Sequence, residues 1–169
     1  MAFGTGHHAT TQLAAKAVQR TARQLLPGFS FLDIGSGTGV LCFIAELYGA
    51  GFTVGIDIDP VCAENMAENR RCNPSSVPVG FIIGGTLDIF KSKTLFDCVV
   101  MNMIRTESEP LIEPIRLLLK PGGRLIWSGI LIEEKQHVVA AARCQGFALE
   151  EETLEEEWWC GVFTVAADN

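Results

Sequence analysis

Hydrophobic and polar positions alternate along the chain in a way that predicts helices and strands in turn. Residues Thr10–Leu26 place apolar side chains at helical spacing, and the Pro27–Gly28 pair predicts the end of that helix. A short apolar run, Phe29–Gly35, follows and ends in glycine, which is typical of a buried parallel strand. The chain therefore starts with a helix and a buried strand.

The same alternation continues to the end of the chain. Further strands are predicted at Phe52–Ile58, Val77–Ile83, Phe96–Ile104 and Arg124–Leu131, and further helices at Val40–Ala50, Pro60–Cys72, Glu109–Leu119 and Glu133–Gly146. Residues 147–167 predict two antiparallel strands around an acidic turn. This order predicts an α/β fold: a doubly wound, mostly parallel sheet with helices on both faces and a reversed terminal β-hairpin.

Length and composition limit the classes of protein that fit. The chain has 169 residues and is expected to form a single domain, with a motif loop and helix at 1–28 and the core sheet at 29–169. Its net charge of −7 argues against a nucleic acid partner. Six cysteines without a Cys-x-x-Cys pair predict reduced, buried thiols in a cytoplasmic protein, and no apolar run is long enough to predict a membrane span.

A glycine-rich loop follows the first predicted strand. In "LDIGSGTG", Gly35, Gly37 and Gly39 would let the backbone turn tightly and approach a ligand, and Asp33 stands two residues before the first glycine. The G-x-G-x-G spacing differs from the G-x-G-x-x-G fingerprint of dinucleotide-binding proteins. Alone, such a loop is weak evidence for a ligand, because many strand–helix turns need glycine for geometry.

The end of the second predicted strand strengthens that evidence. It reads "GIDIDP" and places Asp57 twenty-two residues after Gly35. A carboxylate at this position can accept hydrogen bonds from both ribose hydroxyls of an adenosine ligand. The alternative is that Asp57 or Asp59 only caps the helix that starts at Pro60. We assign the cap to Asp59 and the ribose to Asp57, because the loop and the acid occur together.

At these residues the chain resembles a known family. The pattern D-x-G-x-G-x-G with an acidic second strand is similar to class I methyltransferases that use S-adenosyl-L-methionine. The stretches "MAFGTGHHATT", "LDIGSGTG", "GIDIDP", "FDCVVMNMI" and "EEEWWC" together resemble the ribosomal protein L11 methyltransferases over nearly the whole chain. The resemblance implies a Rossmann-like, seven-stranded sheet and transfer of methyl groups to protein amines, such as lysine or N-terminal amines.

The resemblance also implies a set of cofactor-binding residues. These are Thr5, Gly6, His8, Thr11, Asp33, Gly35, Gly37, Gly39, Asp57, Ile58, Thr86 and Asn102. Thr86 or Asp88 would replace the acid that many methyltransferases have near adenine. Asn102 is the candidate catalytic residue, as a group that positions the amine, because an amide cannot take up its proton.

The opening stretch is interpreted as a lid over the cofactor. Thr10 or Thr11 would cap the first helix and touch the methionine carboxylate. His8 is expected to pack or hydrogen-bond within this loop rather than to bind a metal. The tryptophans are expected to pack in the core or the hairpin, with Trp159 also a candidate to shade the substrate entrance.

Two further departures from the family leave the methyl acceptor open. Relatives carry a separate amino-terminal domain, so the chain is expected to be a catalytic fragment or to recognise another substrate. Arg105, Glu107 and Glu109 would form a charged rim after Asn102, although a solvated helix start is the simpler interpretation. Alternatives are an inactive cofactor-binding or interaction domain, a small-molecule methyltransferase that acts on a small amine, and, less favoured, an NAD-dependent oxidoreductase.

Overall fold

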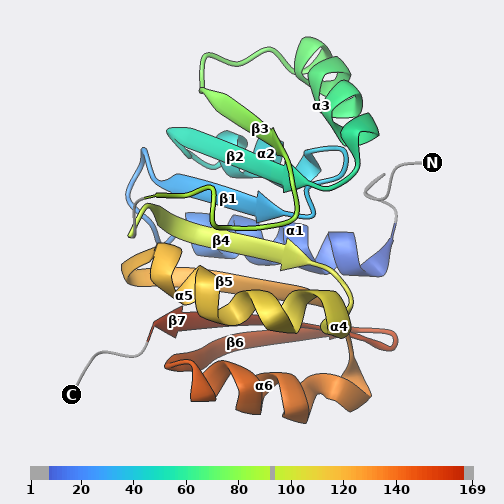
Figure 1. The fold of residues 1–169 in the computed structure, drawn as a ribbon, viewed down its shortest axis with the longest axis vertical. Coiled ribbons are helices and arrows are strands. Elements are labelled where there is room, and N and C mark those ends of the chain that lie inside the picture. The colour runs from blue at the N-terminus through green and yellow to red at the C-terminus, as the bar shows by residue number, and fades with distance from the viewer. Residues whose placement is uncertain (1–7, 92–93, 166–169) are drawn as a thin grey trace.

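The computed structural model describes residues 8–91 and 94–165 (Figure 1). In this part of the chain seven strands form one sheet in the order β3-β2-β1-β4-β5-β7-β6. The strands are β1 (Ser30–Ile34), β2 (Phe52–Asp57), β3 (Val79–Ile83), β4 (Phe96–Asn102), β5 (Leu119–Leu131), β6 (Phe147–Glu155) and β7 (Trp158–Val165).

Most strands of this sheet run in the same direction. The pairs β1–β2, β2–β3, β1–β4 and β4–β5 are parallel, whereas β7 is antiparallel to both β5 and β6. The prediction of a doubly wound, mostly parallel sheet with a reversed terminal hairpin is confirmed. The chain reverses direction along the sheet between β1 and β4, and the carboxyl ends of these two strands lie side by side.

Helices cover both faces of the sheet (Figure 1). One hydrophobic cluster joins the sheet to the first three helices, and a second joins it to the later ones. The first group is α1 (Ala9–Ala22), α2 (Val40–Leu47) and α3 (Pro60–Cys72); the second is α5 (Ile112–Leu118) and α6 (Lys135–Cys144), and the short α4 (Arg105–Ser108) precedes α5. Two 3₁₀ turns, Glu109–Leu111 and Ile132–Glu134, precede α5 and α6. Apolar faces on both sides of the sheet explain why its central strands are buried.

The start of α1 differs from the prediction that a threonine caps it. His8 is the N-cap, and its Nδ1 accepts the backbone N–H of Thr10 at 3.3 Å. Thr10 and Thr11 lie within the first turn and are buried, because the helix packs that face onto the sheet. The helix also ends at Ala22 rather than Leu26, so the turn before Pro27 starts earlier than predicted.

The helix predicted at Glu109–Leu119 begins earlier and is interrupted. It starts at Arg105, passes through a 3₁₀ turn that contains Pro110, and continues as α5. Proline has no backbone N–H to donate into the preceding turn, which favours the change of winding at this point. The earlier start brings residues 105–108 close to the end of β4.

The fifth strand is longer than predicted and the fourth is shorter. β5 begins at Leu119, so the "KPGG" residues expected in a turn belong to the strand. Phe96 pairs with Leu119 and Cys98 with Arg124, and the register shift between these pairs accommodates the extra residues. β4 ends at Asn102 rather than Ile104, because Ile104 is already the N-cap of α4.

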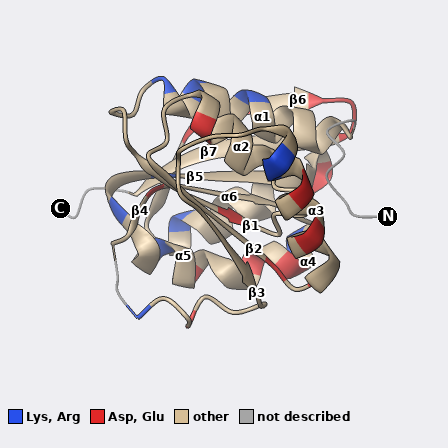
Figure 2. Cartoon of the chain, turned by 90° about the horizontal axis from the view of Figure 1, so that it is seen from above, with Lys and Arg blue, Asp and Glu red and all other residues tan. Residues whose placement is uncertain are grey.

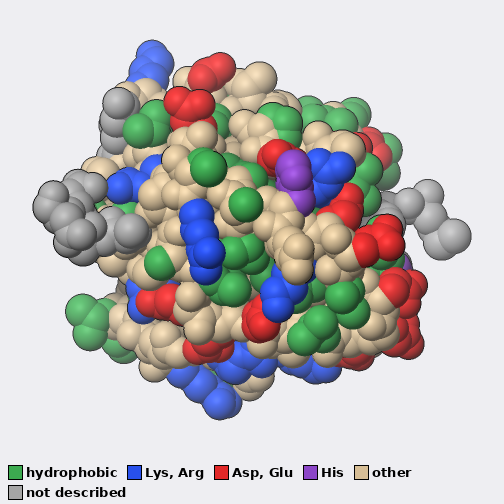
Figure 3. Space-filling model, turned by 90° about the horizontal axis from the view of Figure 1, so that it is seen from below, with side chains coloured by type: hydrophobic (Ala, Val, Ile, Leu, Met, Phe, Trp, Pro, Cys, Tyr) green, Lys and Arg blue, Asp and Glu red, His purple; other side chains and the backbone are tan. Residues whose placement is uncertain are grey.

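The terminal hairpin carries many charges that are paired. Lys135 Nζ lies 2.6 Å from Glu152 Oε2, and Arg124 Nε lies 2.6 Å from Glu150 Oε2. Seen from below, basic and acidic side chains are interspersed, with acids gathered toward one end (Figure 3). In this hairpin Glu150, Glu152, Glu156 and Glu157 are exposed, whereas Glu151 and Glu155 are partly buried.

The cysteines only partly match the expectation of buried thiols. All six are free; Cys42, Cys62, Cys98 and Cys160 are buried, but Cys72 and Cys144 are exposed near the ends of α3 and α6. Within residues 8–91 and 94–165, no helix is both long and apolar enough to cross a bilayer.

Candidate functional site

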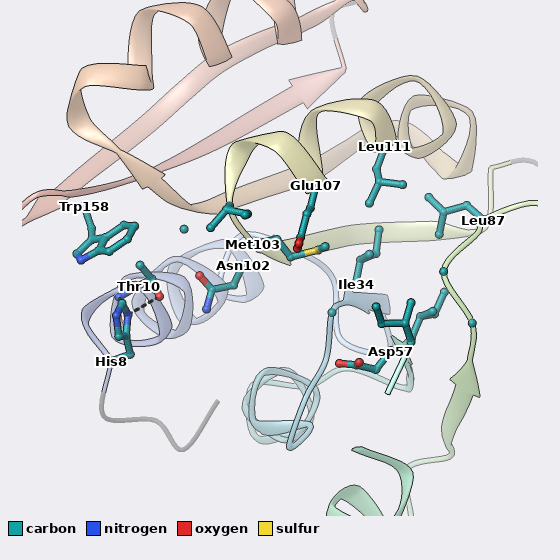
Figure 4. Close-up of a pocket in the computed structure, with 17 residues that line it drawn as sticks. His8, Thr10, Ile34, Asp57, Leu87, Asn102, Met103, Glu107, Leu111 and Trp158 are labelled. Carbon is teal, nitrogen blue, oxygen red and sulfur yellow. Dashed lines mark hydrogen bonds between the residues drawn. The ribbon is translucent and has the colours of Figure 1, made fainter. Parts of the chain in front are cut away.

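A cavity of about 730 Å³ opens at the carboxyl ends of β1, β2 and β4, where the strand order reverses. Ligands of α/β sheets bind at this position, and the volume is in the range of small-molecule sites. Figure 4 shows side chains from several separate segments around it. Among the predicted site residues, those that line it are His8, Gly35, Asp57, Ile58 and Asn102.

The loop after β1 wraps around the end of β2. Gly35 and Gly39 have φ angles of +72° and +78°, a conformation that favours glycine. The backbone N–H groups of Gly35 and Ser36 both donate to the carbonyl of Ile56, at 2.8 and 3.0 Å. The three-glycine spacing therefore folds the loop back onto β2, and of the three glycines only Gly35 lines the cavity.

The Asp57 carboxylate is held by two backbone donors. Gly37 N–H donates to Oδ2 at 2.8 Å, and Asp59 N–H donates to Oδ1 at 3.0 Å. Figure 4 shows the side chain at the cavity wall. Asp59 caps α3 by accepting the N–H of Val61 at 2.9 Å, which confirms the role predicted for it. The cap and the cavity carboxylate are thus two different residues.

Asp33 lies beneath the glycine loop and does not line the cavity. It is 1% exposed, and its Oδ1 has no hydrogen-bond partner in the described part of the chain. Burial, and then the nearby charge of Asp57, raise the pKa of the Asp33 carboxyl to about 8. Its Oδ2 lies 4.0 Å from the Sγ of Cys42. Around neutral pH this aspartate therefore stays largely protonated.

Asn102 joins the cavity to α1. Its amide nitrogen donates to Thr11 Oγ1 at 3.3 Å, while Ser128 Oγ donates to the carbonyl of Thr10 at 3.0 Å. The Asn102 Oδ1 is buried and has no partner among the described residues. Asn102 lines the cavity, and a buried oxygen without a donor is costly until a ligand or solvent group donates to it. Thr11 supports Asn102 without lining the cavity itself.

His8 and Trp158 form the wall of the cavity next to α1. Their rings meet edge to face with centroids 5.3 Å apart, and His8 Nδ1 also lies 2.9 Å from Thr10 Oγ1. The expectation that His8 packs and hydrogen-bonds locally is confirmed. The expectation that Trp159 shades the entrance is wrong: Trp159 is fully buried, and its neighbour Trp158 lines the cavity. Alternation along β7 puts the two rings on opposite faces.

Comparison with known proteins identifies the family. The family described as ribosomal protein L11 methyltransferase (PrmA) matches residues 1–165. This chain belongs to that family. Ribosomal protein L11 methyltransferases from Desulforapulum autotrophicum and Thermus thermophilus are 38% and 40% identical to it, each over 94% of the chain. The aligned region is 51% and 59% of those two proteins, so the chain spans little more than half of their length.

A solved structure of the same family shares the fold. The ribosomal protein L11 methylase from Lactobacillus delbrueckii subsp. bulgaricus superimposes with a TM-score of 0.88 at 24% identity. The superposition covers 99% of this chain and 82% of that one. At this identity the likeness bears on the fold, and it supports the class I methyltransferase architecture that the family predicts.

The wall formed by β2 and β3 is apolar and open. Ile58 lines the cavity although 74% of it is exposed, and Gly84, Gly85 and Leu87 complete this wall. Thr86, which the family resemblance placed near adenine, does not line the cavity. Thr5 and Gly6 lie outside the described residues. Gly84, Gly85 and Leu87 follow the end of β3. The rule that ligands bind at the carboxyl ends of strands could therefore have identified them as lining residues from the sequence.

Two further lining residues were missed by the sequence analysis. Gly129 has a φ of +84°, and a Cβ there would come within 2.7 Å of the Met103 carbonyl oxygen. Met103 in turn donates its N–H to the carbonyl of Ser128 at 3.1 Å. The isolated glycine in "WSGIL" was the available signal, because glycine inside a strand often marks a close approach of two backbones.

The charged rim after β4 separates into two parts. Arg105 binds Glu134 at 2.8 Å and Glu109 at 2.9 Å, and a hydrogen bond from His137, together with Arg105, lowers the pKa of Glu109. These groups satisfy one another outside the cavity. Glu107 instead lines the cavity. Within the described residues, no cluster of three or more His, Cys, Asp or Glu side chains is arranged to hold a metal ion.

Proposed function

We propose that this chain binds S-adenosyl-L-methionine in the cavity and methylates a protein amine, with ribosomal protein L11 as the first candidate substrate. The observation that carries the proposal is one cavity at the β1–β4 switch that unites the glycine loop, the Asp57 carboxylate and the unpartnered Asn102 oxygen. Two relatives at 38% and 40% identity carry the name of that activity.

The residues present suit this cofactor. The Asp57 carboxylate, already oriented by two N–H groups, would accept the ribose hydroxyls, and the apolar wall at Ile58 and Leu87 would face the adenine. Gly35 allows close approach of the backbone to the ligand. No lysine or arginine is among the described residues that line the cavity, which suits a cation. A nicotinamide dinucleotide, with its two phosphates, would find no basic partner there.

The chemistry demands positioning more than acid–base work. The cofactor supplies a methyl group activated by a sulfonium. The acceptor nitrogen must be neutral, and a free lysine amine has a pKa near ~10.4, so the ammonium first loses a proton to water. The nitrogen then forms the N–C bond as the S–C bond breaks with its electron pair left on sulfur. Asn102 Oδ1 would accept a hydrogen bond from an N–H of the amine. This bond would direct the lone pair of the amine nitrogen toward the methyl carbon.

Calorimetry tests the cofactor part of the proposal. We expect S-adenosylmethionine and S-adenosylhomocysteine to bind with micromolar affinity, and NAD to give no heat. The Asn102→Ala variant should keep cofactor affinity within a few fold and lose most methyl transfer. Binding of NAD, or no binding of either adenosyl ligand, would overturn the proposal.

A transfer assay tests the acceptor. Purified ribosomal protein L11 and a short lysine peptide, each with radiolabelled cofactor, should show label in L11. A parallel reaction contains n-butylamine, and label in this small amine but not in L11 would redirect the proposal to a small-molecule methyltransferase. We further propose that residues 1–169 act as one cofactor-binding domain, and that the enzyme works in the cytoplasm, where six free thiols remain reduced.

A further inference from the structure

Glu107 lines the cavity, and its carboxylate has no partner among residues 8–91 and 94–165. It lies on α4, and Figure 4 shows its side chain reaching toward Met103 from the helix above the cavity. The described residues provide no hydrogen bond or ion pair for this carboxylate. The acids around it differ, because Glu109 and Glu134 both bind Arg105.

The arrangement of Arg105 leaves the charge of Glu107 uncompensated. Arg105 is the cation nearest in sequence, yet its guanidinium is engaged by Glu109 and Glu134 outside the cavity. Among the described residues that line the cavity, Asp57 and Glu107 carry carboxylates. Acidic positions on α3, α4 and the β6–β7 turn also lie toward the same end of the sheet (Figure 2). The negative electrostatic potential of these acidic residues favours cationic ligands at the entrance of the cavity.

The two cavity carboxylates lie in different settings. Asp57 is on β2, is bound by two backbone N–H groups and belongs to the wall next to the glycine loop. Glu107 follows β4 by five residues, is exposed, and belongs to the same segment as Asn102. The apolar side chain of Met103 lies between Glu107 and Asn102 in Figure 4. Glu107 and Asn102 therefore both line the cavity from the segment that runs from the end of β4 into α4.

We propose that Glu107 is the specificity-determining residue that binds the ammonium form of the acceptor amine. The inference rests on the proposed methyltransferase function and names which residue selects a charged acceptor. An unpaired carboxylate forms charge-assisted hydrogen bonds with an ammonium, and it opposes loss of the proton while the pair persists. In this scheme Glu107 binds the ammonium form of the acceptor. Asn102 then orients the neutral amine that attacks the methyl group.

A binding experiment separates capture from catalysis. The full chain is saturated with S-adenosylhomocysteine and titrated by NMR with n-butylammonium, a mimic of the lysine side chain, and with the uncharged 1-butanol. Glu107→Gln should weaken n-butylammonium binding about tenfold and leave 1-butanol unchanged. Glu113→Gln is the matched control, because Glu113 is an exposed acid on α5 that does not line the cavity. It should change neither affinity.

The affinity for S-adenosylhomocysteine shows whether Glu107 contacts the amine or the adenosyl ligand. If Glu107→Gln weakens S-adenosylhomocysteine binding as much as n-butylammonium binding, Glu107 contacts the adenosyl ligand and the proposal is overturned. Unchanged n-butylammonium affinity, or none in the wild type, also overturns it. Failure of the wild type to bind S-adenosylhomocysteine would instead refute the methyltransferase function itself. In a transfer assay, Glu107→Gln should raise KM for the amine with little change in kcat, and Glu107→Asp should restore part of the loss.

Discussion

The wall of the cavity formed by β1 and β2 differs from the wall formed by β4, α4 and β7. In the first wall, backbone N–H groups and positive φ angles hold the functional groups, and the Asp57 carboxylate is bound on both oxygens. In the second wall, Asn102, Glu107 and Trp158 come from three separate elements and present side-chain atoms to the cavity. Within the described residues, Asn102 Oδ1 and the Glu107 carboxylate have no partner.

This difference suits two ligands with different demands. A cofactor that is the same in every turnover can be bound by backbone geometry, which side-chain substitution hardly alters. An acceptor that defines specificity is better recognised by side chains, because these change one residue at a time. We therefore expect changes in the first wall to affect stability and cofactor affinity, and changes in the second wall to affect the acceptor.

The largest effect is expected from Asp33, which lies beneath the first wall. A carboxyl whose folded pKa is raised is stabilising below its unfolded pKa of 3.8 and loses that contribution as pH rises through about 8. Asp33→Asn should therefore match the wild type near pH 4 and be more stable above pH 8, by on the order of 3–5 kcal/mol. Urea unfolding at pH 5, 7 and 9 measures the difference. A constant difference across this range would refute the buried, protonated state.

The next largest effect should break the simple division, because Gly129, a cavity residue on β5 next to the second wall, also depends on backbone geometry. Gly129→Ala adds a Cβ within 2.7–2.9 Å of Met103 backbone atoms at a φ of +84°. We expect a loss of roughly 3 kcal/mol in the free energy of unfolding. Gly122→Ala is the control, since its φ is +74° but nothing lies within 4 Å of the added Cβ. That variant should lose only about 1 kcal/mol.

Cofactor affinity should respond to the first wall with a smaller effect. Asp57→Asn keeps the side-chain shape but removes the charge, so we expect S-adenosylmethionine to bind about 10–30-fold more weakly, or roughly 2 kcal/mol. Asp59→Asn is the control, because asparagine caps a helix as well as aspartate and Asp59 does not line the cavity. Calorimetry on both variants checks this. Equal losses in the two would show that the ribose role is misassigned.

The smallest effect is expected at the hairpin behind the second wall. Lys16 Nζ lies 2.8 Å from Glu155 Oε2, and both side chains are about one third or more exposed. Glu155→Gln should change the free energy of unfolding by less than about 0.5 kcal/mol, because solvent and salt screen the pair. Urea unfolding of the wild type and the variant at low and high salt measures this change in the free energy of unfolding. A loss above about 1 kcal/mol would mean that this pair helps to hold the second wall.

Much of the first wall could be predicted from the sequence, because local patterns define it. The spacing of Asp33, Gly35 and Asp57 identified a strand–loop–helix unit and an acid at the end of the next strand. Asp59 was recognised as a cap because proline follows it at the first helical position. These signals act over a few residues, and tertiary packing did not change them.

The second wall could be predicted only in part. Asn102 was found by family resemblance, but Trp158 was missed in favour of Trp159, and Met103 and Gly129 were missed altogether. Which tryptophan faces the cavity depends on the register of β7 against β5, where Trp159 pairs with Ile130 and a register shift follows. The position of Glu107 depends on α4 starting at Arg105, four residues before the predicted helix.

The sequence by itself determined the order of helices and strands, the glycine loop, the acid of β2 and the family. These follow from periodicity and short spacings, which the chain carries without reference to its fold. Only the tertiary structure decided which side chains share the cavity, that Arg105 is neutralised outside it, and that the Asn102 Oδ1 and the Glu107 carboxylate find no partner within the described part of the chain. Those facts arise from contacts between segments far apart in the chain, where register and burial determine which polar atoms remain free.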